Sequence, residues 1–93
     1  MPTIRVRLMK RTSVHSERHA ILTAYLRELR VVRGLTQGEV AEALDRPQTY
    51  VSDIEKNRRG VDLLQVLDFC DAFDIRFEAF SRELMKRIRA KKA

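Results

Sequence analysis

The chain has three histidine and cysteine residues in all, which are among the types that bind metals or act as nucleophiles. His15 and His19 are four residues apart, a spacing that can place two imidazoles on one helix face to hold a metal ion. No third ligand lies near them in the sequence. Cys70 falls on a predicted core face, where a thiol is inert. We therefore expect no metal site, and we expect Cys70 to behave as a small buried hydrophobic residue.

The other ionisable residues form no recognisable catalytic pattern. The chain has no glycine-rich phosphate loop and no nucleophile elbow. Four acidic residues are spaced as a solvated helix face rather than as a carboxylate pair in a cleft: Asp62, Asp68, Asp71 and Asp74. We expect neither enzymatic activity nor a cofactor.

Composition and charge narrow the class of protein further. The chain has 93 residues, of which 44% are hydrophobic and 34% are charged, with a net charge of +6. This length suits one small domain, and a basic balance favours a nucleic-acid or acidic partner. The single cysteine excludes an internal disulfide and fits a reducing cytosol. The sequence has neither a run of 18 apolar residues nor a signal-peptide stretch, so we expect a cytoplasmic protein without a membrane partner.

The positive charge lies at the two ends of the chain. Residues 1–35 carry a net charge of +6 and residues 82–93 a net charge of +5. Residues 36–60 and 61–81 carry net charges of −1 and −4. This pattern is typical of basic arms on a folded body, and the alternative is two flexible, solvated ends.

The first helix is predicted from Ser16 to Arg33. Ser13 or Ser16 can cap its start, and Glu17 is favourable in its first turn. Gly34 supplies the left-handed residue that commonly ends a helix. Apolar residues recur at helical spacing and predict its buried face: Ile21, Leu22, Tyr25, Leu26, Leu29 and Val32.

Two short helices follow. Thr36 and Glu39 form a capping box that begins the second helix, and the turn at 45–47 (Asp-Arg-Pro) ends it. A third helix is predicted from Pro47 to Lys56, and Asn57 can end it. Their apolar faces are Val40, Ala41 and Leu44 in the second helix, and Val51 and Ile54 in the third.

Two more helices complete the predicted body. Asp62 and Gln65 form another capping box at the start of the fourth helix. Its predicted inner stripe is Leu63, Val66, Leu67, Cys70 and Phe73. A corner at 74–76 leads to the fifth helix, which ends in the basic run 89–92. The apolar residues of the fifth helix are Phe77, Phe80, Leu84 and Ile88.

In the N-terminal segment 3–8, the apolar residues recur at every second position rather than at helical spacing. Ile4, Val6 and Leu8 alternate with polar residues, which favours a half-buried strand. No partner strand is evident in the rest of the chain. The segment therefore pairs with the same segment of a second subunit, forms a loose basic arm, or extends the first helix.

The second and third helices carry the functional signal. Two short capped helices separated by a tight turn have the physics of a helix-turn-helix, in which the second helix presents its first turns to the major groove of DNA. The stretch resembles the Cro and phage-repressor family, also called the XRE family. The matching motifs are Thr-Gln-x-x-Val-Ala at 36–41, Pro-Gln-Thr-Tyr-Val-Ser-x-Ile-Glu at 47–55 and the Arg-Arg pair at 58–59.

The resemblance covers about residues 20–80. It implies an all-α, five-helix, lambda-repressor-like helix-turn-helix domain over residues 16–89. Residues 1–15 would form a basic arm or a dimerisation strand, and residues 90–93 a basic tail.

The resemblance also implies roles for individual residues. The residues at family positions that contact bases are Gln48, Thr49 and Asp53. The corresponding phosphate contacts are Gln37, Lys56, Arg58 and Arg59. Gln can pair with adenine, Thr can touch a thymine methyl group, and Asp can accept from cytosine N4. Tyr50 packs over the second helix or approaches DNA. Glu55 resembles a structural position that pairs with Arg30, Arg33 or Arg59.

Two residues depart from the family pattern. The family often has Gly where this chain has Asp45, but Asp is among the better non-glycine residues for a positive φ. The position of Asp53 is often basic or amide-bearing in the family. A carboxylate there repels phosphates and lowers the expected affinity for DNA.

The function predicted from these features is sequence-specific binding of double-stranded DNA by a homodimeric transcriptional repressor. One alternative is an antitoxin that binds a toxin and represses its own operon. A second is a protein-interaction module that has lost DNA binding. The expected dimer surfaces are the segment with Ile4, Val6 and Leu8, and the outer face of the fifth helix near Phe80 and Leu84.

Overall fold

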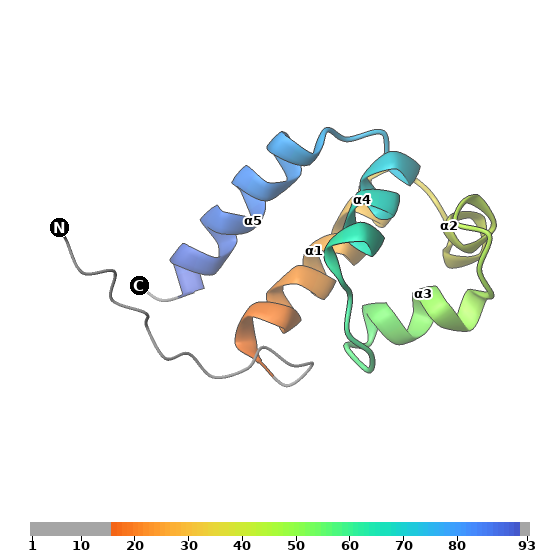
Figure 1. Cartoon of the computed structure of the whole chain (residues 1–93), viewed down its shortest axis with the longest axis horizontal. Helices are drawn as coiled ribbons and strands as arrows, with labels where there is room; N and C mark the ends of the chain where they lie inside the picture. The colour runs from red at the N-terminus through yellow and green to blue at the C-terminus, as the bar shows by residue number, and fades with distance from the viewer. Residues whose placement is uncertain (1–15, 92–93) are drawn as a thin grey trace, which may run out of the picture.

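The structure is a computed structural model that describes residues 16–91. Five helices make up this part of the chain (Figure 1). They are α1 (Glu17–Val32), α2 (Gln37–Ala43), α3 (Gln48–Glu55), α4 (Leu63–Ala72) and α5 (Phe77–Lys91). Helix α1 runs through the middle of the molecule, α5 lies on one side of it, and α2 and α3 lie at the opposite end (Figure 1). The described residues contain no strand, so the all-α, five-helix prediction is confirmed.

Side-chain caps begin three of the helices, as the sequence predicts. The Ser16 hydroxyl accepts the His19 amide at 3.0 Å at the start of α1. Reciprocal capping boxes begin α2, through Thr36 and Glu39, and α4, through Asp62 and Gln65. Helix α3 differs, because its N-cap is Pro47, which provides no side-chain hydrogen bond.

The first four helices end in the same way, with one left-handed residue after the last helical turn. These residues are Gly34 (φ 72°), Asp45 (φ 54°), Asn57 (φ 58°) and Asp74 (φ 53°). The next amide after each of them bonds back to a carbonyl five residues earlier, as in Arg46 to Ala41 at 2.9 Å and Arg58 to Asp53 at 2.8 Å. This pattern is the Schellman motif. Asp45 therefore takes the conformation that the family often assigns to glycine.

All five helices contribute to the core. Its largest fully buried side chains include Phe69, Phe73, Phe80, Leu26 and Ile54. Aromatic contacts join the helices, since the ring centroids of Tyr25 and Phe80 are 5.0 Å apart. Such pairs stabilise a core by ~0.5–1.5 kcal/mol beyond the burial of their area.

Two predicted core residues are exposed instead. Val32 is 72% exposed because α1 ends there and the chain turns away before another element covers it. Leu63 is 62% exposed because it is the first residue of α4, although Val66, Cys70 and Phe73 of the same predicted stripe are buried. The buried stripe of α4 includes Val66, Phe69 and Cys70, so Phe69 was missed.

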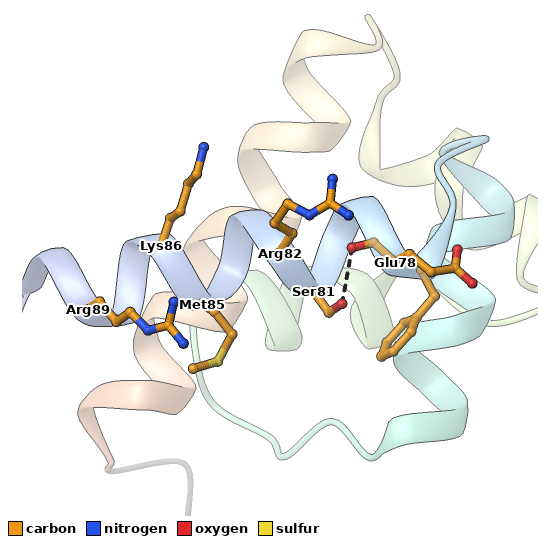
Figure 2. Close-up of a pocket in the computed structure, with 7 residues that line it drawn as sticks. Glu78, Ser81, Arg82, Met85, Lys86 and Arg89 are labelled. Atoms are coloured by element: carbon orange, nitrogen blue, oxygen red, sulfur yellow. Dashed lines mark hydrogen bonds between the residues drawn. The ribbon is translucent and has the colours of Figure 1, made fainter.

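The predicted dimer surface on α5 is also wrong in part. Phe80 is 1% exposed and belongs to the core of its own chain, and Leu84 packs against that core. Figure 2 shows what the outer face of α5 presents: Arg82, Met85, Lys86 and Arg89. The helix also continues to Lys91, two residues into the predicted tail. The arm at 1–15, with Ile4, Val6 and Leu8, lies outside the described residues.

Candidate nucleic-acid interface

Helix α3 exposes most of the side chains predicted to read bases. Val51 and Ile54 are fully buried and fasten α3 to the core. Gln48 and Thr49 are exposed in the first turn, and Asp53 is half-buried one turn further on. The structure thus brings the three predicted base contacts to one short helix. Pro47 gives no side-chain cap, so its side chain does not accept from the first amides of α3 at the positive end of the helix dipole.

The first turn of α3 lies against the first turn of α2. The Gln48 side-chain oxygen is 3.7 Å from the position that a β-carbon would occupy on Gly38. Gln37, the predicted phosphate contact, directly precedes Gly38 at the start of α2. The first turns of the two helices, which carry Gln37 and Gln48, are therefore close together.

A buried acid behind this surface holds α1, α2 and α3 together. The Glu55 side chain is 5% exposed and accepts from Arg30 at 2.6 Å and 3.0 Å. Arg30 also donates to the Leu35 carbonyl at 2.8 Å. The hydrogen bond to Glu55 raises the pKa of Arg30 above its usual value. Of the three arginines that the sequence offered as partners of Glu55, the structure selects Arg30.

Gln37 also contacts Glu55, and we call Arg30, Gln37 and Glu55 the Glu55 cluster. The Nε2 of Gln37 donates to Glu55 at 3.0 Å, so the side chain reaches from α2 to α3. An amide nitrogen carries two hydrogens, and the bond to Glu55 uses one of them. The second hydrogen can be donated to a phosphate without breaking the cluster. The predicted phosphate role of Gln37 is therefore compatible with its structural role.

Tyr50 organises the arginines at the two ends of α3. It is 5% exposed and its ring stacks on Phe69 of α4, with 6.3 Å between centroids. It therefore packs against α4 rather than lying open to solvent. The guanidinium carbons of Arg46 and Arg59 lie 5.1 Å and 4.8 Å from its ring centroid. Burial raises the pKa of Tyr50, so the ring stays neutral and attractive to both cations.

Four basic residues surround α3. Lys56, Arg58 and Arg59 are exposed at its C-terminal end, as the sequence predicts, and Arg46 is exposed before its N-terminal end. Arg46 was not among the predicted contacts. The only signal in the sequence was its position beside the turn proline, because its contact with Tyr50 depends on tertiary packing.

Two of the three residues considered for metal or nucleophilic chemistry are buried in the described part of the chain. His15 lies outside the described residues, and His19 is buried and hydrogen-bonded through both ring nitrogens. Cys70 is buried, and desolvation raises the pKa of its thiol to about 11. Within residues 16–91, no three His, Cys, Asp or Glu side chains come together as metal ligands. No helix of this part of the chain is long and apolar enough to span a membrane.

The fold and the exposed helix define a helix-turn-helix protein. A family model described as a helix-turn-helix domain matches residues 21–76, which are more than half of the chain. The chain therefore belongs to this helix-turn-helix domain family.

Individual proteins of known sequence or structure are similar to the chain. The HTH-type transcriptional regulator PrpR of Mycobacterium tuberculosis (strain ATCC 25618 / H37Rv) is 37% identical over 65 residues, or 70% of this chain. The chain spans 13% of the length of that relative. The restriction-modification controller protein C.Esp1396I superposes with a TM-score of 0.75 at 23% identity, over 80% of this chain and 97% of its own. The C.Esp1396I tetramer in complex with its natural 35 base-pair operator gives the same values.

Proposed function

We propose that this chain binds double-stranded DNA with sequence specificity and acts in the cytoplasm as a homodimeric transcriptional repressor. Helix α3 lies in the major groove, where Gln48, Thr49 and Asp53 read bases. Gln37, Lys56, Arg58 and Arg59 contact phosphates. The proposed function is binding and requires no catalysis.

One observation carries this proposal: an exposed polar row on α3 is flanked at both ends by arginines that Tyr50 holds in place. Arg46 precedes the helix and Arg59 follows it, each within about 5 Å of the same ring centroid. Exposed arginines held beside a groove-binding helix can contact the phosphates at the edge of the groove. We therefore add Arg46 to the proposed phosphate contacts.

A dimer follows from the size of the site. One eight-residue helix reads only a few base pairs. Repressors of this fold class place two recognition helices about 34 Å apart, one turn of DNA, on a two-fold symmetric site. C.Esp1396I, whose fold is similar, forms a tetramer on its operator. We expect two copies of this chain on each operator.

The test begins with selection of bound duplexes from a random DNA pool, which yields the half-site. Affinity for the selected duplex and for a scrambled duplex is then measured between about 50 and 200 mM salt, a range in which several phosphate contacts change affinity by orders of magnitude. We expect a preference for the selected duplex. Arg58→Ala and Arg59→Ala should weaken binding to both duplexes and lower the salt slope by about one each.

Arg82→Ala is the matched control, because Arg82 is an exposed arginine on the outer face of α5, at the opposite side of the molecule from α3 (Figures 1 and 2). It should leave the affinity and the salt slope unchanged. Equal losses from Arg82→Ala and Arg59→Ala would contradict the proposed interface. A protein that retards no duplex even at low salt would favour the interaction module, and a stable complex with a co-encoded toxin would favour the antitoxin.

A further inference from the structure

His19 connects α1 to both ends of the loop between α3 and α4. The side chain is on the first turn of α1, and the residue is 6% exposed. Its Nε2 accepts the Val61 amide at 3.2 Å, and its Nδ1 lies 2.6 Å from Asn57 Oδ1. A backbone amide can only donate, so Nε2 carries no hydrogen. Nδ1 therefore carries the ring hydrogen and donates it to Asn57.

The two residues that His19 contacts enclose the loop. Asn57 is the left-handed residue that ends α3, and Val61 lies just before the N-cap of α4. Between them are Arg58, Arg59 and Gly60, all exposed. The imidazole is therefore a bridge across a five-residue loop, and the exposed part of that loop holds two adjacent arginines.

We propose that His19 is a positioning residue for DNA binding, which fixes the Arg58–Arg59 loop in the geometry that meets the phosphates. This inference rests on the proposed function. A loop with a glycine and two long side chains loses much conformational freedom when it is ordered on a ligand. A loop whose two ends are already held to α1 has lost part of that freedom before DNA arrives, so less is lost on binding.

The bridge complements the contact between Arg59 and Tyr50. The ring of Tyr50 holds the guanidinium end of Arg59 at 4.8 Å. His19 holds the Asn57 side chain before it and the Val61 backbone amide after it. Together they fix the base and the tip of the same side chain from two different helices, α1 and α3.

The experiment is a double-mutant cycle on DNA affinity. His19→Gln and His19→Leu are made in the natural chain and in a chain with Arg58→Ala and Arg59→Ala. Gln has an oxygen near the place of Nε2 and can still accept the Val61 amide, whereas Leu fills the space without accepting. We expect His19→Leu to weaken binding about three- to tenfold in the natural chain, the range for ordering one long side chain. In the double-alanine chain it should change the affinity less than twofold.

His19→Gln should recover at least half of the affinity lost in His19→Leu. Ile88→Val is the control for general destabilisation, since Ile88 is buried on α5, and it should leave the affinity unchanged at temperatures well below unfolding. Equal losses in both arginine backgrounds, or equal affinities of the Gln and Leu variants, would overturn the inference. If neither variant folds, the inference is tested by nitrogen NMR of the natural protein, which reports the tautomer of the His19 ring. An Nδ1–H ring supports the bridge, and an Nε2–H ring overturns it.

The same experiment separates the two proposals. If the natural chain binds DNA and the cycle is additive, only the role of His19 is wrong. If the natural chain binds no duplex at low salt, the proposed function is wrong, and the role of His19 in it is wrong as well.

Discussion

The Glu55 cluster offers the sharpest test of how this small domain is stabilised. Glu55→Ala removes an acid that is 5% exposed and accepts hydrogen bonds from Arg30 and Gln37. The Arg30 side chain is only 13% exposed. Of the contacts described above, its guanidinium keeps the one with the Leu35 carbonyl in this variant. A buried cation that loses its acid is the costly part of the change.

The expected loss of unfolding free energy follows from the burial of the Arg30–Glu55 pair and from the hydrogen bonds that Arg30 keeps. Breaking a fully buried ion pair by removing one partner costs about 3–5 kcal/mol. Arg30 keeps some exposure and one carbonyl, which places the expected loss at the lower end, about 3 kcal/mol. In a domain of this size, 1 kcal/mol corresponds to about 4–8 °C in the midpoint of unfolding. Glu55→Ala should therefore lower the midpoint by roughly 12–24 °C.

Thermal and urea unfolding followed by circular dichroism measure this loss. Glu78→Ala is the matched control, because Glu78 pairs with Arg76 at 3.5 Å while the two side chains are 70% and 87% exposed. Such an exposed pair contributes ~0–1 kcal/mol. If Glu55→Ala costs no more than Glu78→Ala, the cluster does not stabilise the domain and the argument from burial is wrong.

Three further predictions concern single residues. Thr36→Ala, which removes the cap of α2, should cost about 1 kcal/mol of unfolding free energy, measured against Ser81→Ala in α5, where the half-buried serine caps no helix. Asp53→Asn should strengthen binding to random duplexes and alter the preference at one base pair per half-site by roughly 1–3 kcal/mol; unchanged affinity and preference would place α3 outside the groove. Because the pKa of the Cys70 thiol is raised to about 11, the unfolded chain releases this proton first, so stability should fall as the pH rises from about 9 to about 11. A Cys70→Ala variant should lack this part of the decline.

Local signals explain why the helix boundaries could be predicted from the sequence. Thr36 with Glu39 and Asp62 with Gln65 satisfy the amides of a first turn within four residues, so no distant contact is needed. Gly34 ends α1 for an equally local reason, its tolerance of a positive φ. A helix end that is determined by residues within one helical turn can be located from the sequence without knowledge of the fold.

The composition of the core was less predictable, because burial depends on what lies opposite each residue. Val32 continues the apolar stripe of α1, yet it lies at the helix end where no element covers it. Phe69 lies off the predicted stripe of α4, but Tyr50 from α3 stacks on it. The contacts of Arg46 and His19 could not be predicted for the same reason. Their partners are distant from them or are set by tertiary packing: Tyr50 for Arg46, and Asn57 and Val61 for His19.

The net charge of a segment is a poor guide to the charge of its surface. Residues 36–60 carry a net charge of −1, which by itself argues against contact with DNA. Glu55 contributes to that count, but it is buried and paired with Arg30, which lies outside the segment. The basic residues of the segment, in contrast, are all exposed: Arg46, Lys56, Arg58 and Arg59.

The remaining acids differ in how closely they approach the proposed groove surface. Glu39 is tied to the start of α2 by hydrogen bonds with Thr36, the backbone amide first, which lower the pKa of its carboxyl and keep it charged. Asp53 is the acid on the proposed base-reading row of α3. At that position a carboxylate repels phosphates, but it also has a specific partner, the amino group of cytosine. A charge that weakens binding to every phosphate can in this way increase the difference between one base pair and the others.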